Sequence, residues 1–220
     1  MVYSAVIFDM DGTLLDTLED LADSVNYMLG RFGYPPKTKD LVCDSVGNGV
    51  SYLIERSLPN GLDDPNFEEA VRVYKEHYAG NCMNKTRPYP RIMQTLGVLK
   101  DAGVKSAIVS NKSDSAVKAL NEAFFKDYID VALGEAPGIK KKPAPDLILR
   151  ALSDLRALKE EAVYVGDSEV DIMTAKNAGM RCISVSWGFR EPGFLKESGA
   201  EIIIDCPGDI MKILERGFPV

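Results

Sequence analysis

The chain has 220 residues, of which 45% are hydrophobic and 27% charged, the balance of an ordinary folded protein and not of a disordered one. Its formal net charge of −7 argues against a protein that binds nucleic acid, because such proteins usually carry clustered Lys and Arg. No apolar run approaches the roughly 20 residues that span a bilayer, and no signal-peptide pattern develops before Asp9. We therefore expect a cytoplasmic protein that does not bind membranes.

Cysteine and histidine chemistry is only weakly indicated. The four cysteines lie far apart without a CxxC pair, which predicts reduced, structural thiols in place of a zinc or redox site: Cys43, Cys82, Cys182 and Cys206. The only histidine, His77, lies in an expected helix, and no G-x-S-x-G sequence accompanies it. A Ser-His-Asp mechanism is therefore not expected.

The first expected strand, residues 5–8, is followed by a long helical stretch. Helices are expected over 17–32, 39–46, 50–58 and 66–81, with no strand pattern between them. This predicts an all-helical domain, residues 17–86, inserted into a core formed by residues 1–16 and 87–220. The polar connections at 15–17 and 85–90 suit a hinge.

From residue 92 onward, helical and strand patterns alternate. Strands are expected over 104–109, 131–133, 162–165, 181–185 and 201–204, and helices over 92–102, 113–124, 146–155, 169–178 and 208–216. Such alternation predicts an α/β fold with a doubly wound parallel sheet. Sheets of this kind bind ligands beyond the carboxyl ends of their strands, which is where polar residues gather here.

Acidic residues follow two of these strands. Asp9 and Asp11 come directly after residues 5–8, while Asp167, and Asp171 one helical turn later, follow residues 162–165. Carboxylates packed closely together raise each other's pKa unless a cation neutralises them. Hard oxygen ligands, without His or Cys nearby in sequence, predict a magnesium ion.

The sequence also offers groups that suit a phosphate. Ser110 follows a strand, and the helix expected from Ser113 provides free backbone N–H groups and a favourable dipole. Lys142 adds positive charge, and Pro143 after it favours an extended segment there.

Each feature has a simpler interpretation when taken alone. Asp-x-Asp-Gly also fits a solvated turn or part of a calcium loop, and residues 140–142 fit an exposed basic run. Asp167 and Asp171 also fit a helix N-cap followed by a surface acid. The order of acid pair, serine, lysine and acid pair, mostly after predicted strands, is far more specific than any of its parts.

Together these residues closely resemble the four motifs of the haloacid dehalogenase superfamily. The motifs read Asp9-Met10-Asp11-Gly12-Thr13, Ser110-Asn111, Lys142-Pro143 and Gly166-Asp167-Ser168-Glu169-Val170-Asp171. The resemblance runs over essentially the full chain. It implies a Rossmann-like core with a small helical cap inserted after the first motif.

The resemblance also implies a role for each motif residue. Asp9 would be the nucleophile that takes the phosphoryl group, and Asp11 would protonate the leaving oxygen and later activate water. The phosphate would be held by Gly12, Ser110, Asn111 and Lys142. Magnesium would be held by Asp9, the backbone carbonyl of Asp11, and Asp167, with Asp171 supporting these ligands.

Two positions narrow the expected reaction within the superfamily. Asp11 favours phosphatases and phosphomutases, since dehalogenase and phosphonatase relatives carry no acid there. Thr13 favours a phosphatase over the β-phosphoglucomutase branch. The chain is therefore expected to be a phosphoric monoester hydrolase.

The segments 45–50, 53–56 and 186–190 look like those of phosphatases that act on 2-phosphoglycolate. In the expected cap, Gly47 and Gly49 would let the backbone approach a ligand and Asn48 could donate a hydrogen bond, although a helix-capping turn fits equally well. The expected partner is a small phosphorylated metabolite, and the expected state is a monomer or weak homodimer.

Five alternatives remain at this point. A pyrophosphatase, or a sugar phosphatase or phosphomutase of the same superfamily, would use the same motifs. A receiver-like phospho-switch module also combines an acid cluster, a hydroxyl and a lysine, but it has no inserted cap. A regulatory protein on an inactive scaffold would not need every motif residue, and all of them are present.

Overall fold

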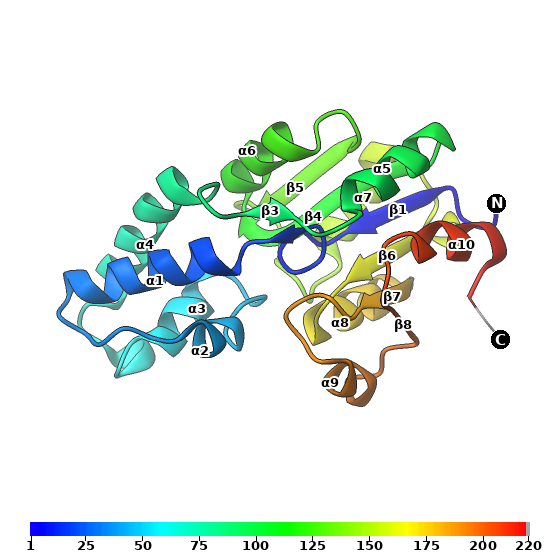
Figure 1. Ribbon diagram of the computed structural model, residues 1–220. Helices are drawn as coiled ribbons and strands as arrows, with labels where there is room; N and C mark the ends of the chain where they lie inside the picture. The colour runs from blue at the N-terminus through cyan, green and yellow to red at the C-terminus, as the bar shows by residue number, and fades with distance from the viewer. Residues whose placement is uncertain (219–220) are drawn as a thin grey trace. The chain divides into compact units, whose positions relative to one another are not determined.

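The structure is a computed structural model, and it describes residues 1–218. The chain forms two compact units, one from Met1–Leu15 with Pro88–Val220 and the other from Asp16–Arg87 (Figure 1). We call the first the α/β unit and the second the helical unit. Their borders differ by one residue at each side from the predicted core (1–16 and 87–220) and cap (17–86).

The α/β unit contains a six-stranded sheet in the order β5-β4-β1-β6-β7-β8, in which every neighbouring pair is parallel. The strands are β1 Ala5–Phe8, β4 Lys105–Ser113, β5 Val131–Glu135, β6 Ala162–Gly166, β7 Arg181–Val185 and β8 Ile202–Ile204. The helices of this unit are α5 Ile92–Asp101, α6 Asp114–Phe124, α7 Asp146–Leu155, α8 Glu169–Ala178, α9 Pro192–Glu197 and α10 Asp209–Arg216. The predicted doubly wound α/β fold is confirmed.

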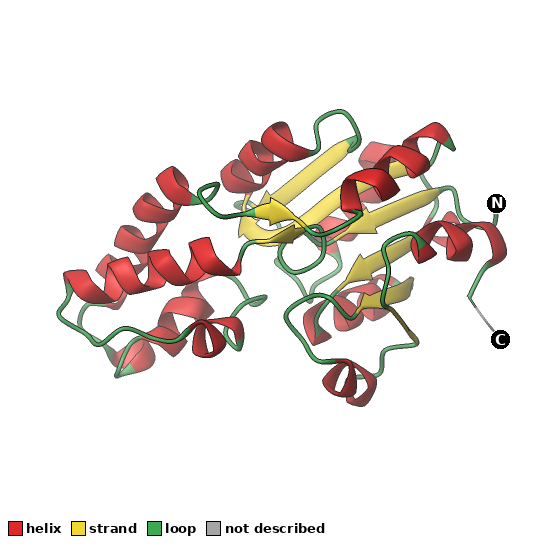
Figure 2. Cartoon of the chain, in the orientation of Figure 1, coloured by secondary structure: helices red, strands yellow, loops and turns green. Residues whose placement is uncertain are grey.

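The central strand β1 is buried on both faces of the sheet. Ala5 and Ile7 belong to a core cluster with apolar residues of α7 and α8, and the alternating Val6 and Phe8 are also buried. Figure 2 shows helices on both sides of the strands. Burial of both faces explains why residues 5–8 form a continuous apolar run instead of an alternating one.

The helical unit contains four α-helices: α1 Leu18–Arg31, α2 Lys39–Cys43, α3 Val50–Ser57 and α4 Phe67–Asn81. Helices α1 and α4 pack together. His77 on α4 stacks on Tyr27 of α1 with ring centroids 4.0 Å apart, and its Nδ1 lies 3.0 Å from the Ser24 hydroxyl. The single histidine is thus engaged in packing within this unit.

A buried carboxylate joins the beginning and end of the helical unit. Asp20, in the first turn of α1, accepts hydrogen bonds from the backbone N–H groups of Lys85 (3.0 Å) and Thr86 (2.9 Å). The Thr86 hydroxyl also donates to it at 2.8 Å. Asp20 is only 2% exposed, so these bonds satisfy a charge that burial would otherwise disfavour. We call this set the Asp20 clamp.

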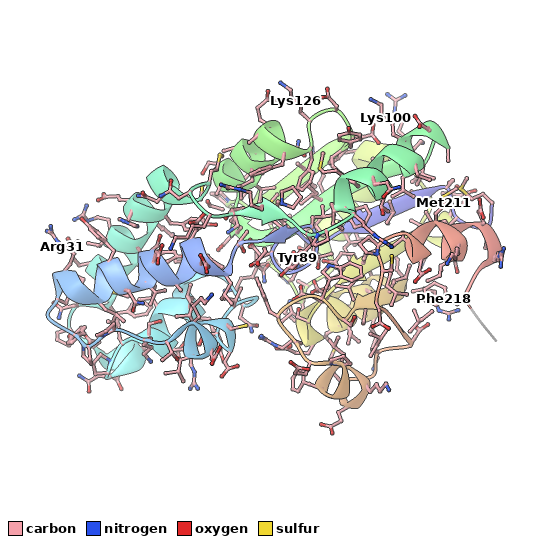
Figure 3. The ribbon with its side chains drawn as sticks, viewed as in Figure 1. Arg31, Tyr89, Lys100, Lys126, Met211 and Phe218 are labelled. Carbon is pink, nitrogen blue, oxygen red and sulfur yellow. The ribbon has the colours of Figure 1, made fainter. Side chains whose placement is uncertain are left out.

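The chain passes between the units through two short strands, β2 Leu15–Asp16 and β3 Arg87–Pro88, which form a two-stranded sheet. Tyr89, which is labelled in Figure 3, follows β3. Its backbone N–H donates to the Leu14 carbonyl at 3.1 Å. These strands were not predicted, because two residues are too few to show a periodic pattern.

Other differences from the prediction concern the ends of elements. Strand β4 extends to Ser113 instead of ending at residue 109, with a register shift against β5 between Val109 and Ser113. The polar residues 110–113 therefore lie in the strand and not after it. Helix α2 ends at Cys43, three residues before the predicted end, and the six-residue helix α9 was not predicted.

Candidate active site

Asp9 lies directly beyond β1, and its backbone N–H still donates to the Val165 carbonyl of β6 at 2.9 Å. The chain then turns sharply: the N–H groups of Leu14 and Leu15 both donate to the Met10 carbonyl, and Gly12 adopts a φ of 84°. This turn places Asp9 and Asp11 at the carboxyl end of the sheet. The predicted convergence of polar residues therefore occurs where parallel strands end.

Lys142 lies at the centre of a buried charge network. Its Nζ is 2.7 Å from Asp9 Oδ1 and 2.8 Å from Asp171 Oδ1, and its side chain is 2% exposed. It also donates to the Tyr164 hydroxyl at 3.2 Å, and that hydroxyl donates to Asp171 Oδ1 at 2.9 Å. The lysine predicted to bind phosphate is thus held beside the predicted nucleophile.

Asp171 belongs to helix α8 and is fully buried. Its Oδ2 accepts from the N–H groups of Asp167 (3.2 Å) and Ser168 (3.1 Å) and from the Ser168 hydroxyl (2.6 Å). Ser168 is the N-cap residue of α8 and forms a capping box with Asp171. The alternative interpretation, in which Asp167 is the N-cap and Asp171 a surface acid, is therefore wrong. With Oδ1 bound to Lys142 and Tyr164, Asp171 supports the network from behind.

Asp167 is held by two segments of the α/β unit, the loop after β1 and the segment after β7. Its Oδ1 accepts from the Thr13 hydroxyl at 3.1 Å, and its Oδ2 accepts from the Phe189 N–H at 2.7 Å. The Trp187 indole N–H donates to the Thr13 carbonyl at 3.0 Å. The segment after β7 is thereby fixed against the loop that carries Asp9 and Asp11.

Glycines make room for Asp167. A Cβ on Gly12 would lie 2.2 Å from Asp167 Oδ2, and a Cβ on Gly188 would lie 2.2 Å from Asp167 Cβ and 2.5 Å from the Gly12 carbonyl. Gly12 is one of the residues predicted to bind phosphate. Its φ of 84° and this close approach require glycine at that position whether or not it contacts phosphate, and the phosphate contact stays a prediction.

Burial and crowding shift the protonation of this cluster. Burial, followed by repulsion from Asp171, Asp167 and Asp11, raises the pKa of Asp9 well above its ordinary value, although Lys142 opposes the shift. Burial and then Asp171 raise the pKa of Asp167 to about 7. Burial disfavours charge on Lys142, but Asp171 and Asp9 outweigh it and raise its pKa.

The acidic cluster fits a divalent metal ion. Carboxylate oxygens of Asp9, Asp167 and Asp171 lie within 4.8 Å of one another. Because both oxygens of Asp171 already accept several hydrogen bonds, Asp9 and Asp167 are the better ligands. A cation would neutralise the crowding that raises their pKa values, and an all-oxygen set suits Mg²⁺. The contribution of the Asp11 carbonyl stays a prediction.

The second motif, Ser110-Asn111, contacts the segment that carries Lys142. Asn111 Oδ1 accepts from the Lys142 N–H at 2.7 Å, and Asn111 Nδ2 donates to the Lys142 carbonyl at 2.9 Å. Through these two bonds the Asn111 side chain positions the Lys142 backbone, and the predicted phosphate contact of Asn111 stays a prediction. The buried Ser110 hydroxyl accepts from the Lys112 N–H at 3.2 Å. Its phosphate-binding role stays a prediction.

Two side chains of the site were missed by the sequence-based reasoning. Lys112, two residues after Ser110 in β4, places its Nζ 3.2 Å from Asp11 Oδ2. Tyr164 appeared only as an apolar residue of an expected strand, yet its hydroxyl joins Lys142 and Asp171. The signal for Lys112 was its place in the polar run that follows an apolar strand; Tyr164 gave no comparable signal.

The predicted specificity residues belong to the helical unit. Gly47 and Gly49 have φ values of 111° and 86°, and Gly49 is the N-cap residue of α3. The segment therefore forms the helix-capping turn that the sequence left open as an alternative. A substrate contact by Gly47, Asn48 or Gly49 stays a prediction.

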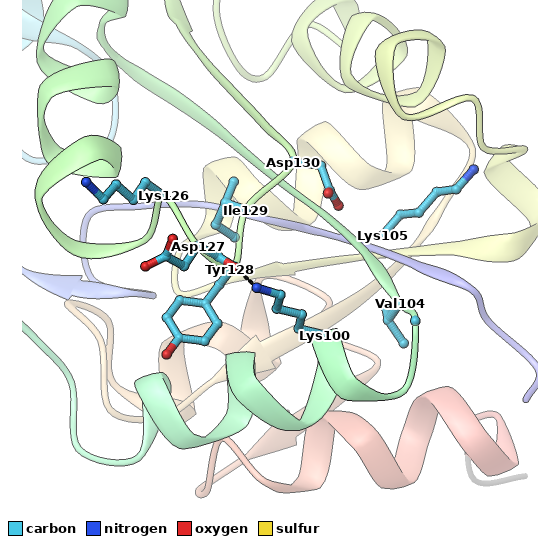
Figure 4. A pocket seen from close by; sticks show the side chains of 9 residues that line it. Lys100, Val104, Lys105, Lys126, Asp127, Tyr128, Ile129 and Asp130 are labelled. Atoms are coloured by element: carbon cyan, nitrogen blue, oxygen red, sulfur yellow. Dashed lines mark hydrogen bonds between the residues drawn. The ribbon is translucent and has the colours of Figure 1, made fainter.

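A separate hollow of about 220 Å³ lies at the amino ends of β4 and β5, at the other end of the sheet from Asp9 (Figure 4). Its lysines are already engaged: Lys100 Nζ donates to the Asp127 carbonyl at 2.6 Å and Lys105 Nζ to the Arg156 carbonyl at 3.0 Å. Lys126 pairs with Glu122 at 3.1 Å. Asp127 and Asp130 also line this hollow, but it contains none of the four sequence motifs.

Two whole-chain predictions can also be compared with the structure. The four cysteines are free thiols, as expected. Within residues 1–218, none of the helices combines the length and apolar character needed to cross a membrane.

The chain is similar to known proteins over nearly its whole length. Phosphoglycolate phosphatase of Aquifex aeolicus is 33% identical over 212 residues, which cover 96% of each chain. Phosphoglycolate phosphatase of Pasteurella multocida is 33% identical over 97% of this chain and 99% of its own.

Solved structures share the fold over nearly the whole chain. A crystal structure from Lactobacillus delbrueckii subsp. bulgaricus is 36% identical with a TM-score of 0.92, covering 97% of this chain and 99% of its own. A predicted phosphoglycolate phosphatase from Haemophilus somnus is 29% identical with a TM-score of 0.89, covering 97% and 98%. The model of the family described as haloacid dehalogenase-like hydrolase matches residues 6–185. With its motif residues gathered at one end of the sheet, the chain belongs to the haloacid dehalogenase-like hydrolase family.

Proposed function

We propose that the chain is a magnesium-dependent phosphatase that hydrolyses a small phosphomonoester, with 2-phosphoglycolate as the leading substrate. The observation that carries this proposal is the convergence of Asp9, Lys142 and Asp167 beyond the strand ends, with Asp11 on the same loop. The names of the relatives in Aquifex and Pasteurella support the choice of substrate.

The first step transfers the phosphoryl group to Asp9. A carboxylate oxygen of Asp9 attacks phosphorus, the bond from phosphorus to the ester oxygen breaks, and Asp11 gives its proton to that oxygen. In the second step water attacks the phosphoaspartate, its proton passes to Asp11, and the aspartyl oxygen leaves. Inorganic phosphate and the free Asp9 carboxylate result.

The surrounding residues bind and orient the phosphate. Lys142 is fixed by Asp171, Tyr164 and Asn111, so its charge is already in place beside Asp9. Such preorganised charge is the principal protein contribution to phosphoryl transfer. Ser110 is the second expected phosphate contact. Mg²⁺, held by Asp9 and Asp167, would offset the negative charge of the phosphate when bound.

The first experiment measures phosphate release from 2-phosphoglycolate with and without Mg²⁺. We expect Asp9→Asn to lower kcat by about a thousandfold or more, because the amide is not a nucleophile. Excess chelator should abolish activity in the original chain. The matched control is Asp101→Asn, which removes an exposed carboxylate at the end of α5. Full activity of Asp9→Asn would contradict the aspartyl mechanism.

A substrate panel then separates the remaining alternatives. Phosphate release is compared among 2-phosphoglycolate, pyrophosphate and several sugar phosphates. A mutase would conserve esterified phosphate, and a receiver-like switch would label once without turnover. We expect the highest kcat/KM with 2-phosphoglycolate.

A further inference from the structure

Lys112 is a second buried lysine of the site, distinct from Lys142. Its side chain is only 6% exposed, and its Nζ lies 3.2 Å from Asp11 Oδ2. The backbone around it is closely packed, since a Cβ on Gly134 of β5 would come within 2.6 Å of the Lys112 carbonyl oxygen. The ammonium group is therefore held at a defined place near the end of β4.

Lys142 and Lys112 each pair with a different aspartate of the site. Lys142 Nζ pairs with Asp9, where the phosphate would bind, whereas Lys112 Nζ pairs with Asp11, which would face the leaving oxygen. Asp11 Oδ1 is buried and has no hydrogen-bond partner among the described residues. One oxygen of Asp11 is thus available to the leaving group, while the other is held by Lys112. The atoms attached to the leaving oxygen would come close to Lys112.

A purely structural role explains Lys112 poorly. Removing an ammonium and a carboxylate from water costs free energy that their attraction often fails to recover, so a buried ion pair is weak support for a fold. Asp11 is 14% exposed, so the pair lies at an accessible edge of the site. An ammonium has three N–H donors, and it can keep Asp11 while it binds a further anion.

We propose that Lys112 recognises a negatively charged group on the leaving alcohol and thereby selects phosphate esters of small hydroxy acids. This inference rests on the proposed phosphatase function and deepens it. In 2-phosphoglycolate the carboxylate is attached to the carbon that bears the ester oxygen, so Lys112 can bind it while Asp11 serves that oxygen. A neutral alcohol of the same size would leave Lys112 without this contact.

The test compares an anionic and a neutral substrate of similar size. The measured quantity is kcat/KM for 2-phosphoglycolate divided by kcat/KM for 2-hydroxyethyl phosphate, in which CH₂OH replaces the carboxylate. We expect Lys112→Met to lower this ratio by about tenfold to a hundredfold, the range for loss of a hydrogen bond to a charged group. A ratio unchanged within about twofold would overturn the inference, because Lys112 would then act on both substrates alike.

Lys118→Met is the matched control. Lys118 is 65% exposed on α6 and pairs with Asp114 at 2.6 Å, so its replacement makes the same change of net charge away from the site. The ratio should stay as in the original chain. Thermal unfolding of each variant shows whether it folds.

The original chain provides a second measurement, which stands even if Lys112→Met does not fold. In the original chain, kcat/KM for 2-phosphoglycolate should exceed that for 2-hydroxyethyl phosphate by about tenfold or more, because one charge-assisted hydrogen bond contributes about that factor. A ratio near one would overturn the inference. Absence of phosphate release from both substrates and from p-nitrophenyl phosphate would overturn the proposed function and this inference with it. If the chain is a phosphatase but Lys112→Met leaves the kcat/KM ratio unchanged, the inference about Lys112 is overturned and the proposed function stands.

Discussion

Tyr164 is the uncharged member of a buried network that otherwise consists of Lys142, Asp9 and Asp171. Its hydroxyl accepts from Lys142 and donates to Asp171, and both contacts are fully enclosed. The hydroxyl therefore helps to set where the lysine ammonium lies relative to Asp9. Removing it should leave the fold intact but loosen the placement of Lys142.

We predict that Tyr164→Phe lowers kcat by about tenfold, the effect of losing one or two modest hydrogen bonds, while KM changes less. The ring is retained, so the core packing is kept. Steady-state kinetics with 2-phosphoglycolate checks this. Tyr128→Phe, at the other end of the sheet, is the control and should behave as the original chain. Equal kcat values for the two variants would show that the Tyr164 hydroxyl is dispensable.

Asp167 makes the stability of the metal-free protein depend on pH. Its pKa is about 7 in the folded chain, against an ordinary value of 3.8. Between these values the folded state binds more protons than the unfolded state, so the free energy of unfolding falls as pH rises from about 4 to about 7. Bound Mg²⁺ would favour the ionised carboxylate and oppose this loss.

We therefore predict a lower thermal midpoint at pH 8 than at pH 5 in excess chelator. At pH 8, Mg²⁺ at about a hundred times its Kd should raise the midpoint by about 5 °C or more. Scanning calorimetry at both pH values checks the two effects. An increase of the chelated protein's midpoint from pH 5 to pH 8 would contradict the assigned state of Asp167.

At the scale of elements, the segment after β7 packs against Asp167 and so lines one side of the candidate metal site. The Phe189 N–H binds Asp167, the Trp187 indole binds the Thr13 carbonyl, and Gly188 lies between them against Asp167. The path of the backbone here depends on a residue without a side chain. The segment after β7 and the loop after β1 thus pack together around the Asp167 carboxylate.

We predict that Gly188→Ala lowers the free energy of unfolding by about 1–3 kcal/mol, because the added methyl overpacks a filled space. It should also raise the Mg²⁺ concentration needed for half-maximal activity. Urea unfolding and Mg²⁺ titration check these effects. The control is Gly193→Ala in α9, where a Cβ meets nothing within 4 Å. If the two variants have the same free energy of unfolding and the same Mg²⁺ dependence, the segment after β7 can shift to accept the added methyl group.

At the scale of the whole molecule, the Asp20 clamp closes the helical unit where its chain enters and leaves. Asp20→Ala would leave the buried Thr86 N–H and hydroxyl, and the Lys85 N–H, without their acceptor. We predict a loss of about 2–4 kcal/mol in the free energy of unfolding. Hydrogen exchange at residues 85 and 86 should accelerate.

Asp23→Ala is the control for the clamp. Asp23 lies on the same helix and pairs with Lys85 at 2.8 Å, but both side chains are about half exposed. Exposed ion pairs contribute little, so the loss should be much smaller. Equal losses in the two variants would contradict a special role for Asp20.

The sequence predicted what is local and left out what depends on distant partners. Asp9 and Asp167 could be found because apolar strands end at them, and the helix ends were mostly within one or two residues. Lys112 was missed because its burial depends on the extension of β4 past residue 109 and on Asp11, which lies far away in sequence. Asp20 had the pattern of an ordinary first-turn acid, since its partners lie 65 and 66 residues later.

The clamp has a consequence for how such chains can diversify. Because the helical unit begins and ends at one carboxylate, it is a self-contained insertion whose two ends leave together through β2 and β3. The groups assigned to chemistry, from Asp9 to Asp171, all belong to the other unit. Substitutions within this insertion leave the residues assigned to chemistry unchanged in sequence. New substrates could then be acquired on an inherited mechanism.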